Sequence, residues 1–319
     1  MPRALILGAT GQDGQFLADF LMGKKYEVLG ISRTKEPFQT NPLGLRRPNF
    51  QSIDVTNFQD LSNLINGFKP DEIYNLAGES SVSKSFKAPT QTIESNVIGL
   101  VNLLSILVHN PKLQAIRVFQ ASSAEMFGSS NKALNEDSTF NPVSPYAISK
   151  LAAHKICSSY RSNFGIWISC GILFNHESEL RPETFVFQKI ITSAVAISRK
   201  KERSIKLGNI EISRDWGYSK DYVEAMWLTL QAGKPDDFVI ATGRKHSLRD
   251  LIETVFKTLN IEQGVGEILE IDSSLSRPTD VASTFGDPRK IEEELGWKAK
   301  TNFEELVGLL VHHQLKHVF

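Results

Sequence analysis

The chain has little cysteine, no net charge and no recognisable pattern of metal ligands. Only two of its 319 residues are cysteine, Cys157 and Cys170, which is too few for a disulfide framework and suits a reducing compartment. Lys and Arg together number 36, as do Asp and Glu, so the basic excess typical of nucleic-acid-binding proteins is missing. The His and Cys residues show no metal-ligand spacing. We therefore expect no metal and no nucleic-acid partner.

The sequence also shows no pattern typical of a leader segment or of a membrane span. The first expected strand begins almost at Met1, which leaves no room for a signal peptide. The longest apolar stretch, Val97–Val108, is interrupted by Asn102 and is shorter than the ~20 residues that cross a bilayer. The sequence therefore predicts a cytoplasmic protein without a membrane partner.

What the chain does contain is an alternation of apolar runs and helical patterns. This alternation predicts an α/β fold, namely a Rossmann-type doubly wound parallel sheet with a smaller C-terminal substrate-binding lobe. We expect a cofactor-binding domain at 1–174 with a returning segment at 214–243, and the substrate lobe at 175–213 and 244–319. Strands are expected at 3–8, 26–31, 50–53, 72–76, 115–120, 166–173, 204–208, 212–214 and 237–241. After residue 174, helices are expected at 183–199, 219–232, 247–260, 287–295 and 302–316, the last three in the smaller lobe.

A glycine fingerprint opens the chain. Gly8, Gly11 and Gly14 directly follow the apolar run at 4–7 and precede apolar residues at helical spacing. A strand, tight turn and helix in this order let the backbone approach a pyrophosphate and point free N–H groups at its charge. The alternative is an ordinary glycine turn, which the context disfavours. The pattern indicates a dinucleotide site.

The end of the second expected strand indicates which dinucleotide is bound. NAD-binding folds usually carry an acidic residue there, but this strand runs out at Ser32, Arg33 and Thr34. A guanidinium at Arg33 suits a 2′-phosphate, so NADP is favoured, the alternative being a surface arginine. Asp54, after the third strand, is expected either to accept from the adenine amino group or to cap the helix near Asn57.

Tyr146 and Lys150 lie four residues apart on one face of an expected helix, after Ser144 and Pro145. An ammonium group and a cationic nicotinamide would both favour the phenolate, which makes Tyr146 a candidate general base and Lys150 a candidate ligand of the cofactor ribose. The alternative is a core tyrosine beside a surface lysine. Ser123 favours the catalytic interpretation because it follows a strand that ends at the same edge of the sheet.

Together, the glycines, Ser123, Tyr146 and Lys150 resemble the extended short-chain dehydrogenase/reductases. Within that superfamily, longer runs are similar to GDP-mannose 4,6-dehydratases, and reductases and epimerases do not share them. The resemblance extends from the first strand to Gly296 and Trp297. The runs lie at 73–78, 171–178, 214–217, 221–228, 237–243 and 277–280.

The resemblance implies an internal redox reaction that converts GDP-mannose to GDP-4-keto-6-deoxy-mannose, the first step toward GDP-deoxyhexoses. Tyr146 would take the proton of the hydroxyl on the fourth sugar carbon as hydride leaves for NADP, with Ser123 hydrogen-bonded to the developing oxygen. Glu125 would remove the hydrogen on the fifth carbon, water would leave from the sixth, and the hydride would return there. A reductase has no need of this carboxylate, so Glu125 favours dehydration. The alternative for Glu125 is a solvated carboxylate at a strand end.

The resemblance also implies two sets of binding residues. For Arg214, which belongs to the substrate set, the alternative to substrate binding is a local ion pair with Asp215. The cofactor set is Gly8, Thr10, Gly11, Gln12, Asp13, Gly14, Arg33, Asp54, Val55, Leu76, Ala77, Tyr146, Lys150 and His176. The substrate set is Ser81, Asn175, Glu177, Arg181, Lys189, Arg214 and Arg277.

The chain departs from the family pattern in places. Ala124 removes a hydroxyl before Glu125, and Glu79 places a carboxylate near the cofactor pyrophosphate or the sugar, which suggests an altered sugar. Thr34 replaces a second arginine, and the loop after it is shorter than in some relatives, which leaves a homodimer and a homotetramer both open. Alternatives in function are a dehydratase for a related sugar such as GDP-manno-heptose, a 4-keto-sugar reductase or epimerase, and a non-catalytic NADP-sensing scaffold.

Overall fold

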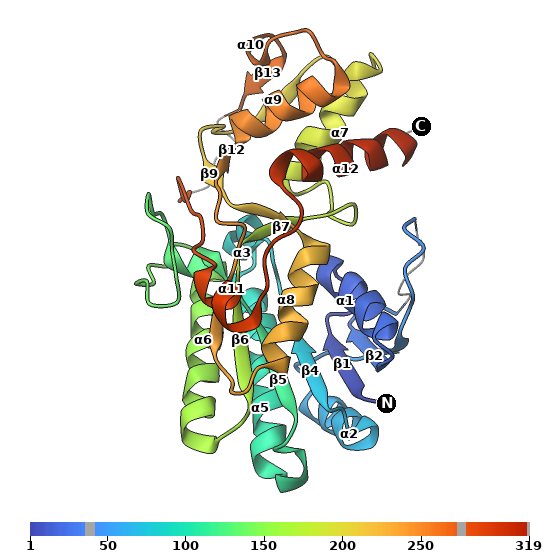
Figure 1. The fold of residues 1–319 in the computed structure, drawn as a ribbon, viewed down its shortest axis with the longest axis vertical. Helices are drawn as coiled ribbons and strands as arrows, with labels where there is room; N and C mark the ends of the chain where they lie inside the picture. The colour runs from blue at the N-terminus through green and yellow to red at the C-terminus, as the bar shows by residue number, and fades with distance from the viewer. Residues whose placement is uncertain (36–41, 273–278, 318–319) are drawn as a thin grey trace.

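The protein was analysed as a computed structural model that describes residues 1–35, 42–272 and 279–317. Two lobes are stacked along its long axis (Figure 1). The lower lobe in that view is built around a central sheet, and the upper lobe is mainly helical.

The central sheet has seven strands, all parallel, in the order β11-β6-β5-β4-β1-β2-β3. The order reverses between β1 and β4, and ligands of such sheets bind at the carboxyl ends of the strands beside this switch point. The predicted doubly wound sheet is therefore confirmed. Its strands are β1 (Arg3–Leu7), β2 (Glu27–Ser32), β3 (Asn49–Ser52), β4 (Glu72–Asn75), β5 (Arg117–Ser123), β6 (Ile168–Leu173) and β11 (Asp237–Ile240).

Helices cover both faces of the sheet because alternate strand residues are apolar on both sides. Leu5 and Leu7 of β1 pack with α2 (Phe58–Phe68), α5 (Gly99–His109) and α6 (Pro145–Phe164). Ala4 and Ile6 pack on the opposite side with α1 (Gln12–Gly23), α8 (Ser219–Gln231) and α11 (Arg289–Leu295). The expectation that 287–295 belongs to the smaller lobe is wrong, since Ile291 of α11 lies in the core of the sheet.

One helical stretch is longer than the apolar run Val97–Val108 that was found in the sequence. α4 (Pro89–Ile93), a π-helical turn at Glu94–Ile98 and α5 are continuous and span Pro89–His109. With 21 residues and a mean hydropathy of 1.4, this stretch is long and apolar enough to cross a membrane by composition, contrary to the expectation from Val97–Val108 alone. However, Leu103, Leu104 and Leu107 are fully buried against the sheet, as in the core helix of a globular domain.

The second lobe has a hydrophobic core of its own. It is formed by α7 (Val186–Ser198), α9 (Leu248–Leu259) and α12 (Phe303–His317), with α10 (Val265–Ile268) and the parallel pair β8 (Ile205–Leu207) and β13 (Leu269–Ile271). Two further pairs of very short strands lie where the chain passes between the lobes. They are β7 (Asn175–Glu177) with β10 (Trp216–Tyr218), and β9 (Ser213–Arg214) with β12 (His246–Ser247).

Candidate active site

A cleft of about 490 Å³ lies at the carboxyl ends of the strands and is lined by residues of both lobes. It brings together most of the residues that the sequence predicted for catalysis and binding. These are Gly8, Gly11, Gln12, Asp13, Gly14, Leu76, Ser81, Ser123, Glu125, Tyr146, Lys150, Asn175, His176, Glu177, Arg181, Lys189 and Arg214.

The glycine turn at the start of α1 has the shape that a dinucleotide requires. Gly8 has a positive φ of +89°, and a Cβ there would lie 2.9 Å from the backbone nitrogen of Ala77. A Cβ on Gly14 would lie 2.4 Å from the carbonyl oxygen of Gly8. Gly11 is the N-cap of α1, so the free N–H groups of the first turn begin at the cleft. This backbone fits a pyrophosphate group.

Polar side chains connect the glycine turn to β7. His176 Nε2 lies 2.8 Å from Asp13 Oδ2, and His176 Nδ1 lies 2.7 Å from the carbonyl oxygen of Phe174. Gln12 accepts a 2.6 Å hydrogen bond from the hydroxyl of Ser178. Burial alone would raise the pKa of Asp13, but His176 and then Arg181 lower it to about 2. The Asp13 carboxylate therefore stays ionised, and the turn is held in one position relative to β7.

Tyr146 and Lys150 lie on the first turns of α6, as predicted. Ser144 caps this helix by accepting from the backbone N–H of Ala147, and Pro145 occupies its first position. The Tyr146 phenol lies beside the Ser123 hydroxyl, which acts to lower the pKa of the phenol, and Lys150 Nζ donates to the carbonyl oxygen of Ala121 at 2.9 Å. Strand β5, helix α6 and the glycine turn thus converge on one point of the cleft.

Burial changes the acidity of both groups. It raises the pKa of Tyr146 to about 12, with the charge of Glu125 acting in the same direction and the Ser123 hydrogen bond opposing it. Burial also lowers the pKa of Lys150 to about 8, partly offset by Asp13. Burial therefore disfavours the phenolate in the protein alone, and the expectation that the ammonium group of Lys150 and a cationic nicotinamide favour it stays a prediction.

Glu125 lies on a 3₁₀ turn, Ala124–Phe127, that directly follows β5. Its backbone N–H donates to Ser123 Oγ at 3.2 Å, and its carboxylate lies 3.9 Å from Arg214 Nε. Only 15% of the Glu125 side chain is exposed, so the alternative of a solvated carboxylate is wrong. The carboxylate lines the cleft in the same turn of chain as Ser123.

Arg214 is buried and faces the cleft, between Glu125 and Asp280. Its NH1 donates to the carbonyl oxygen of Val281 at 2.6 Å. The alternative of an ion pair with Asp215 is wrong, because Asp215 accepts from the backbone N–H groups of 242, 243 and 286. Burial raises the pKa of Asp215 to about 6, with those hydrogen bonds acting against the rise.

The other predicted ligands of the substrate that the structure describes lie around the same cleft. Arg181 Nε donates to Glu177 Oε2 at 2.8 Å, and Lys189 Nζ donates to the carbonyl oxygen of Lys206 at 2.8 Å. Burial raises the pKa of Glu177, while Arg181 acts to lower it. These groups are positioned by protein partners before any substrate binds.

Glu79 lies beside the cleft, as its departure from the family pattern led us to expect, because burial and then the charges of Glu125 and Glu79 raise the pKa of Tyr146. Its carboxylate accepts from the backbone N–H groups of Ser80 and Ser81 and pairs with Lys84 Nζ at 2.5 Å. Glu79 is not among the residues that line the cleft. It stabilises the start of α3 (Val82–Lys87), where Ser81 is the N-cap. That Glu79 signals an altered sugar stays a prediction.

Several predicted cofactor residues lie outside the lining of this cleft. The Asp54 carboxylate accepts from Thr56, and Asn57 caps α2, so the capping alternative for Asp54 is wrong. Arg33 is exposed at the end of β2 and stays a prediction. Arg277 lies outside the described residues. The others outside the lining are Thr10, Val55, whose side chain is in the core, and Ala77.

The sequence reasoning missed the apolar wall that the second lobe contributes. Single apolar residues in loops and short strands carry no motif, so no signal could have placed them in the cleft. Trp216 and Asp280 are exceptions, because they lie in the runs at 214–217 and 277–280 and could have been found there. The missed residues include Phe185, Val186, Leu207, Asn209, Ile212, Trp216, Leu248 and Asp280.

Comparisons with known proteins agree with this arrangement. The family described as GDP-mannose 4,6 dehydratase matches residues 5–310. GDP-mannose 4,6 dehydratase 1 of Arabidopsis thaliana is 40% identical over 98% of this chain and 90% of its own length.

Solved structures show the same fold at lower identity. UDP-glucose 4-epimerase of Thermus thermophilus, in complex with NAD, has a TM-score of 0.85 at 22% identity, over 99% of this chain and 100% of its own. The protein called RMD from Pseudomonas aeruginosa, in complex with NADPH, has a TM-score of 0.81 at 21% identity over 100% of both chains. With the family match over nearly its full length, the chain belongs to the GDP-mannose 4,6-dehydratase family, a family of lyases.

Proposed function

We propose that this chain dehydrates GDP-mannose to GDP-4-keto-6-deoxy-mannose on bound NADP, the first step toward GDP-deoxyhexoses. The observation that supports this most directly is the position of Glu125. Its carboxylate shares one cleft with Ser123 and Tyr146, and Arg214 lies opposite. A reductase of the same fold needs the serine and tyrosine but has no use for this carboxylate.

The residues of the cleft divide the proton transfers between them. Tyr146 receives the proton of the hydroxyl on the fourth sugar carbon, and the Ser123 hydroxyl stabilises the oxygen as it becomes a carbonyl. The carbonyl acidifies the hydrogen on the fifth carbon, which Glu125 removes. The protonated Glu125 then returns its proton to the hydroxyl that leaves from the sixth carbon as water. When bound, a nicotinamide would supply the hydride chemistry, with hydride leaving the fourth carbon and returning to the sixth. As the hydride returns, the fifth carbon takes up a proton from solvent and Tyr146 releases the proton that it received, so the protons balance.

The same positions favour one orientation of the nucleotide sugar. Lys189 and Arg214 are cations that line the second-lobe side of the cleft, and we assign to them the diphosphate of the GDP moiety. The Glu177–Arg181 pair is assigned to the sugar hydroxyls. The first domain, 1–174 with 214–243, would hold the cofactor, and the smaller lobe, without α11, would hold the GDP-sugar.

A turnover assay tests this function. The protein is incubated with GDP-mannose and a catalytic amount of NADP, and the product is identified by mass spectrometry. Loss of one water per GDP-mannose with no net use of NADP is expected. Consumption of NADPH with a keto-sugar would instead identify a reductase. Turnover of a GDP-heptose and not of GDP-mannose would identify the GDP-heptose as the substrate.

NADP is proposed over NAD because Arg33 stands exposed at the end of β2, where an acidic residue would bind the ribose of NAD. Replacing Arg33 by Ala removes a charge-assisted contact to the 2′-phosphate, so we expect the KM for NADP to rise about 10- to 100-fold. The KM for NAD is expected to stay the same. Initial rates at varied cofactor measure this. Lys35→Ala, an exposed lysine two residues on, is the matched control.

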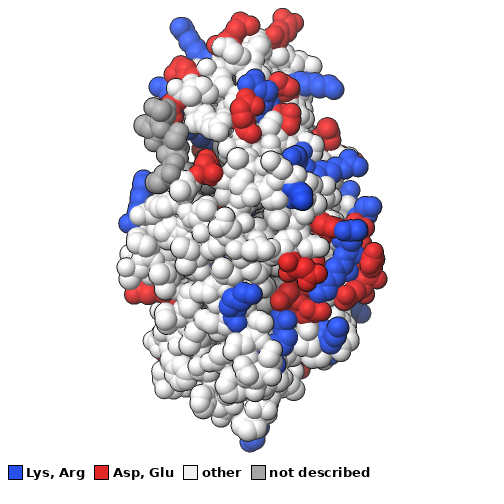
Figure 2. All heavy atoms as spheres, turned by 90° about the vertical axis from the view of Figure 1, so that its left-hand side faces the viewer, with Lys and Arg blue, Asp and Glu red and all other residues white. Residues whose placement is uncertain are grey.

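A second copy of this chain is the proposed protein partner. Figure 2 shows a broad area almost without charged side chains on the side of the molecule that α6 occupies in Figure 1. Large apolar side chains are exposed on the helices α4 to α6. They are Ile93 (45%), Ile98 (43%), Ile148 (53%) and Phe164 (52%). Such a face suits an isologous helix-to-helix interface. We also propose a cytoplasmic location, with no membrane or nucleic-acid partner.

Replacing Ile148 by Asp is expected to convert the oligomer to a smaller species, because a carboxylate in an apolar interface is buried without a partner. Light scattering coupled to size exclusion measures the mass. Ile271→Asp, at an exposed isoleucine of β13 in the second lobe, is the matched control and should leave the mass unchanged. An unchanged mass for the Ile148 variant would exclude this face.

A further inference from the structure

Helix α6 carries ionisable side chains beyond the two used in catalysis. Tyr146, Lys150, His154, Cys157 and Arg161 recur every three or four residues, so they share the face that packs against β5 and β6. His154 is buried, although a histidine is rarely buried without a partner. The mechanism proposed above gives it no role.

The carboxyl end of β5 is attached to this face of α6 at three consecutive residues. Lys150 Nζ donates to the carbonyl oxygen of Ala121 at 2.9 Å. His154 Nδ1 lies 3.0 Å from the hydroxyl oxygen of Ser122. The hydroxyl of Ser123 lies beside the phenol of Tyr146, whose pKa it acts to lower. The contact of His154 with Ser122 therefore lies between the contacts that two catalytic side chains of α6, Lys150 and Tyr146, make with β5. All three contacts directly precede the turn that carries Glu125.

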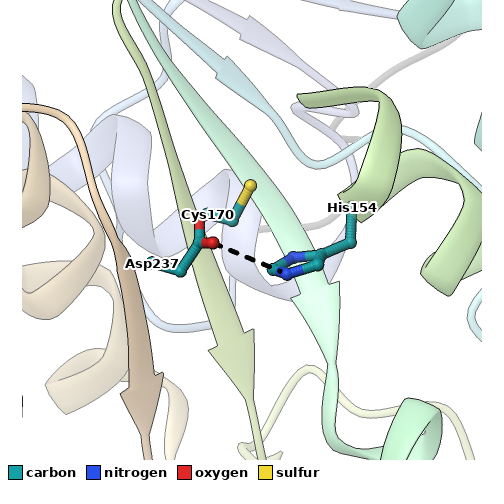
Figure 3. A group of neighbouring side chains, drawn as sticks. All are labelled: His154, Cys170 and Asp237. Atoms are coloured by element: carbon teal, nitrogen blue, oxygen red, sulfur yellow. Dashed lines mark ion pairs between the residues drawn. The ribbon is translucent and has the colours of Figure 1, made fainter. Parts of the chain in front are cut away.

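His154 is itself held from its other side. Its Nε2 lies 3.6 Å from Asp237 Oδ2, and Figure 3 shows the two side chains meeting across β6 beside Cys170. Arg161 also pairs with Asp237, and the ring of Phe140 packs edge-on against the imidazole at 5.4 Å. Burial by itself would lower the pKa of His154, but Cys170 and Asp237 raise it, and Lys155 acts in the opposite direction. The imidazole therefore has one orientation, with Nδ1 toward Ser122.

A metal site is the other interpretation of this cluster. Ligand atoms of His154, Cys170 and Asp237 lie within 4.8 Å of one another (Figure 3). However, the guanidinium of Arg161 already neutralises Asp237 and lies 3.9 Å from Cys170 Sγ. The hydrogen bond to Cys157 and burial raise the pKa of Cys170 well above its usual range, so the thiolate that a soft cation requires is disfavoured. Hydrogen bonding, and not cation binding, accounts for the cluster.

We propose that His154 is a positioning residue for dehydration: anchored to Asp237, it fixes Ser122 and thereby the strand end that presents Ser123 to Tyr146 and Glu125 to the cleft. The inference rests on the proposed function, because it concerns the groups assigned to the two proton transfers. Neither His154 nor Asp237 lines the cleft, so they act through Ser122 and not on the sugar.

Two single variants and their combination test the proposal. His154→Phe keeps an aromatic ring beside Phe140 but removes both polar contacts, and Ser122→Ala removes the hydroxyl alone. We expect His154→Phe to lower kcat about tenfold and Ser122→Ala about fivefold, with KM for GDP-mannose within about twofold of the unchanged protein. The double variant should be no slower than His154→Phe, because the two side chains act through one hydrogen bond.

His154→Gln supplies the conservative variant, since its amide still donates a hydrogen bond, and it should recover much of kcat. Cys157→Ala, one turn further along the same face, is the matched control for packing and should leave kcat unchanged. Thermal unfolding of each variant separates lost stability from lost turnover. An unchanged kcat in His154→Phe, or single effects that multiply in the double variant, would overturn the proposal.

Amide hydrogen exchange in residues 117–127 of the substrate-free protein provides a readout that does not depend on the reaction. Exchange should be faster in His154→Phe and Ser122→Ala and unchanged in Cys157→Ala. If the unchanged protein does not turn over GDP-mannose, the proposed function fails. The kcat of each variant is then compared with that of the unchanged protein on whichever GDP-sugar the protein does turn over. Failure of the proposed function and failure of the role of His154 therefore stay distinct.

Discussion

Replacing Glu125 by Gln is expected to lower formation of the 6-deoxy sugar by about 10²- to 10⁴-fold, because the amide cannot take the hydrogen from the fifth carbon. Oxidation of the fourth carbon depends on Ser123 and Tyr146 and should continue. The absorbance of reduced cofactor should therefore accumulate with stoichiometric GDP-mannose, and mass spectrometry should find the 4-keto sugar with its water retained.

Deuterium provides the sharper measurement for this variant. In D₂O the unchanged protein should place deuterium on the fifth carbon of the product, because the hydrogen removed by Glu125 is lost to solvent. The variant should show no such exchange. Glu183→Gln is the matched control, since Glu183 accepts from Thr192 and lies outside the lining of the cleft. Full activity or full exchange in the Glu125→Gln variant would remove Glu125 from the mechanism.

The sheet and the catalytic helix were predictable because their signals are local. The run at 4–7 is apolar and directly followed by Gly8, and Ser144 with Pro145 marks the start of α6 at the sequence level. The spacing of Tyr146 and Lys150 then places both on one face. These features need no information about distant parts of the chain.

The parts that were mispredicted depend on distant contacts. β5 was expected to end at residue 120, yet it continues to Ser123, where Lys150 and His154 of α6 hold its last residues. The partner of Arg214 was equally non-local. Asp215, its neighbour in sequence, faces the backbone N–H groups of 242, 243 and 286, so the guanidinium turns to Glu125.

Replacing Tyr146 by Phe is expected to lower kcat by about 10²- to 10⁴-fold, because the phenol beside Ser123 is the group placed to act as the base. The affinity for GDP-mannose, measured by calorimetry, should change little. Tyr160→Phe, near the other end of the same helix, is the matched control. A residual rate close to that of the unchanged protein would assign the first proton transfer to another group.

The pH dependence of the first hydride transfer also tests the assignment of Tyr146 as the base. A base with its pKa raised to about 12 is mostly protonated at neutral pH, so the rate should rise with pH. Lys150, with a pKa of about 8, loses its proton above that pH. Its positive charge then no longer favours the phenolate, so the rise of the rate with pH should level off. The charge of Glu125 raises the pKa of Tyr146, so in Glu125→Gln the rising limb should move to lower pH. A limb that stays in place, or one that persists in Tyr146→Phe, would show that a different group titrates.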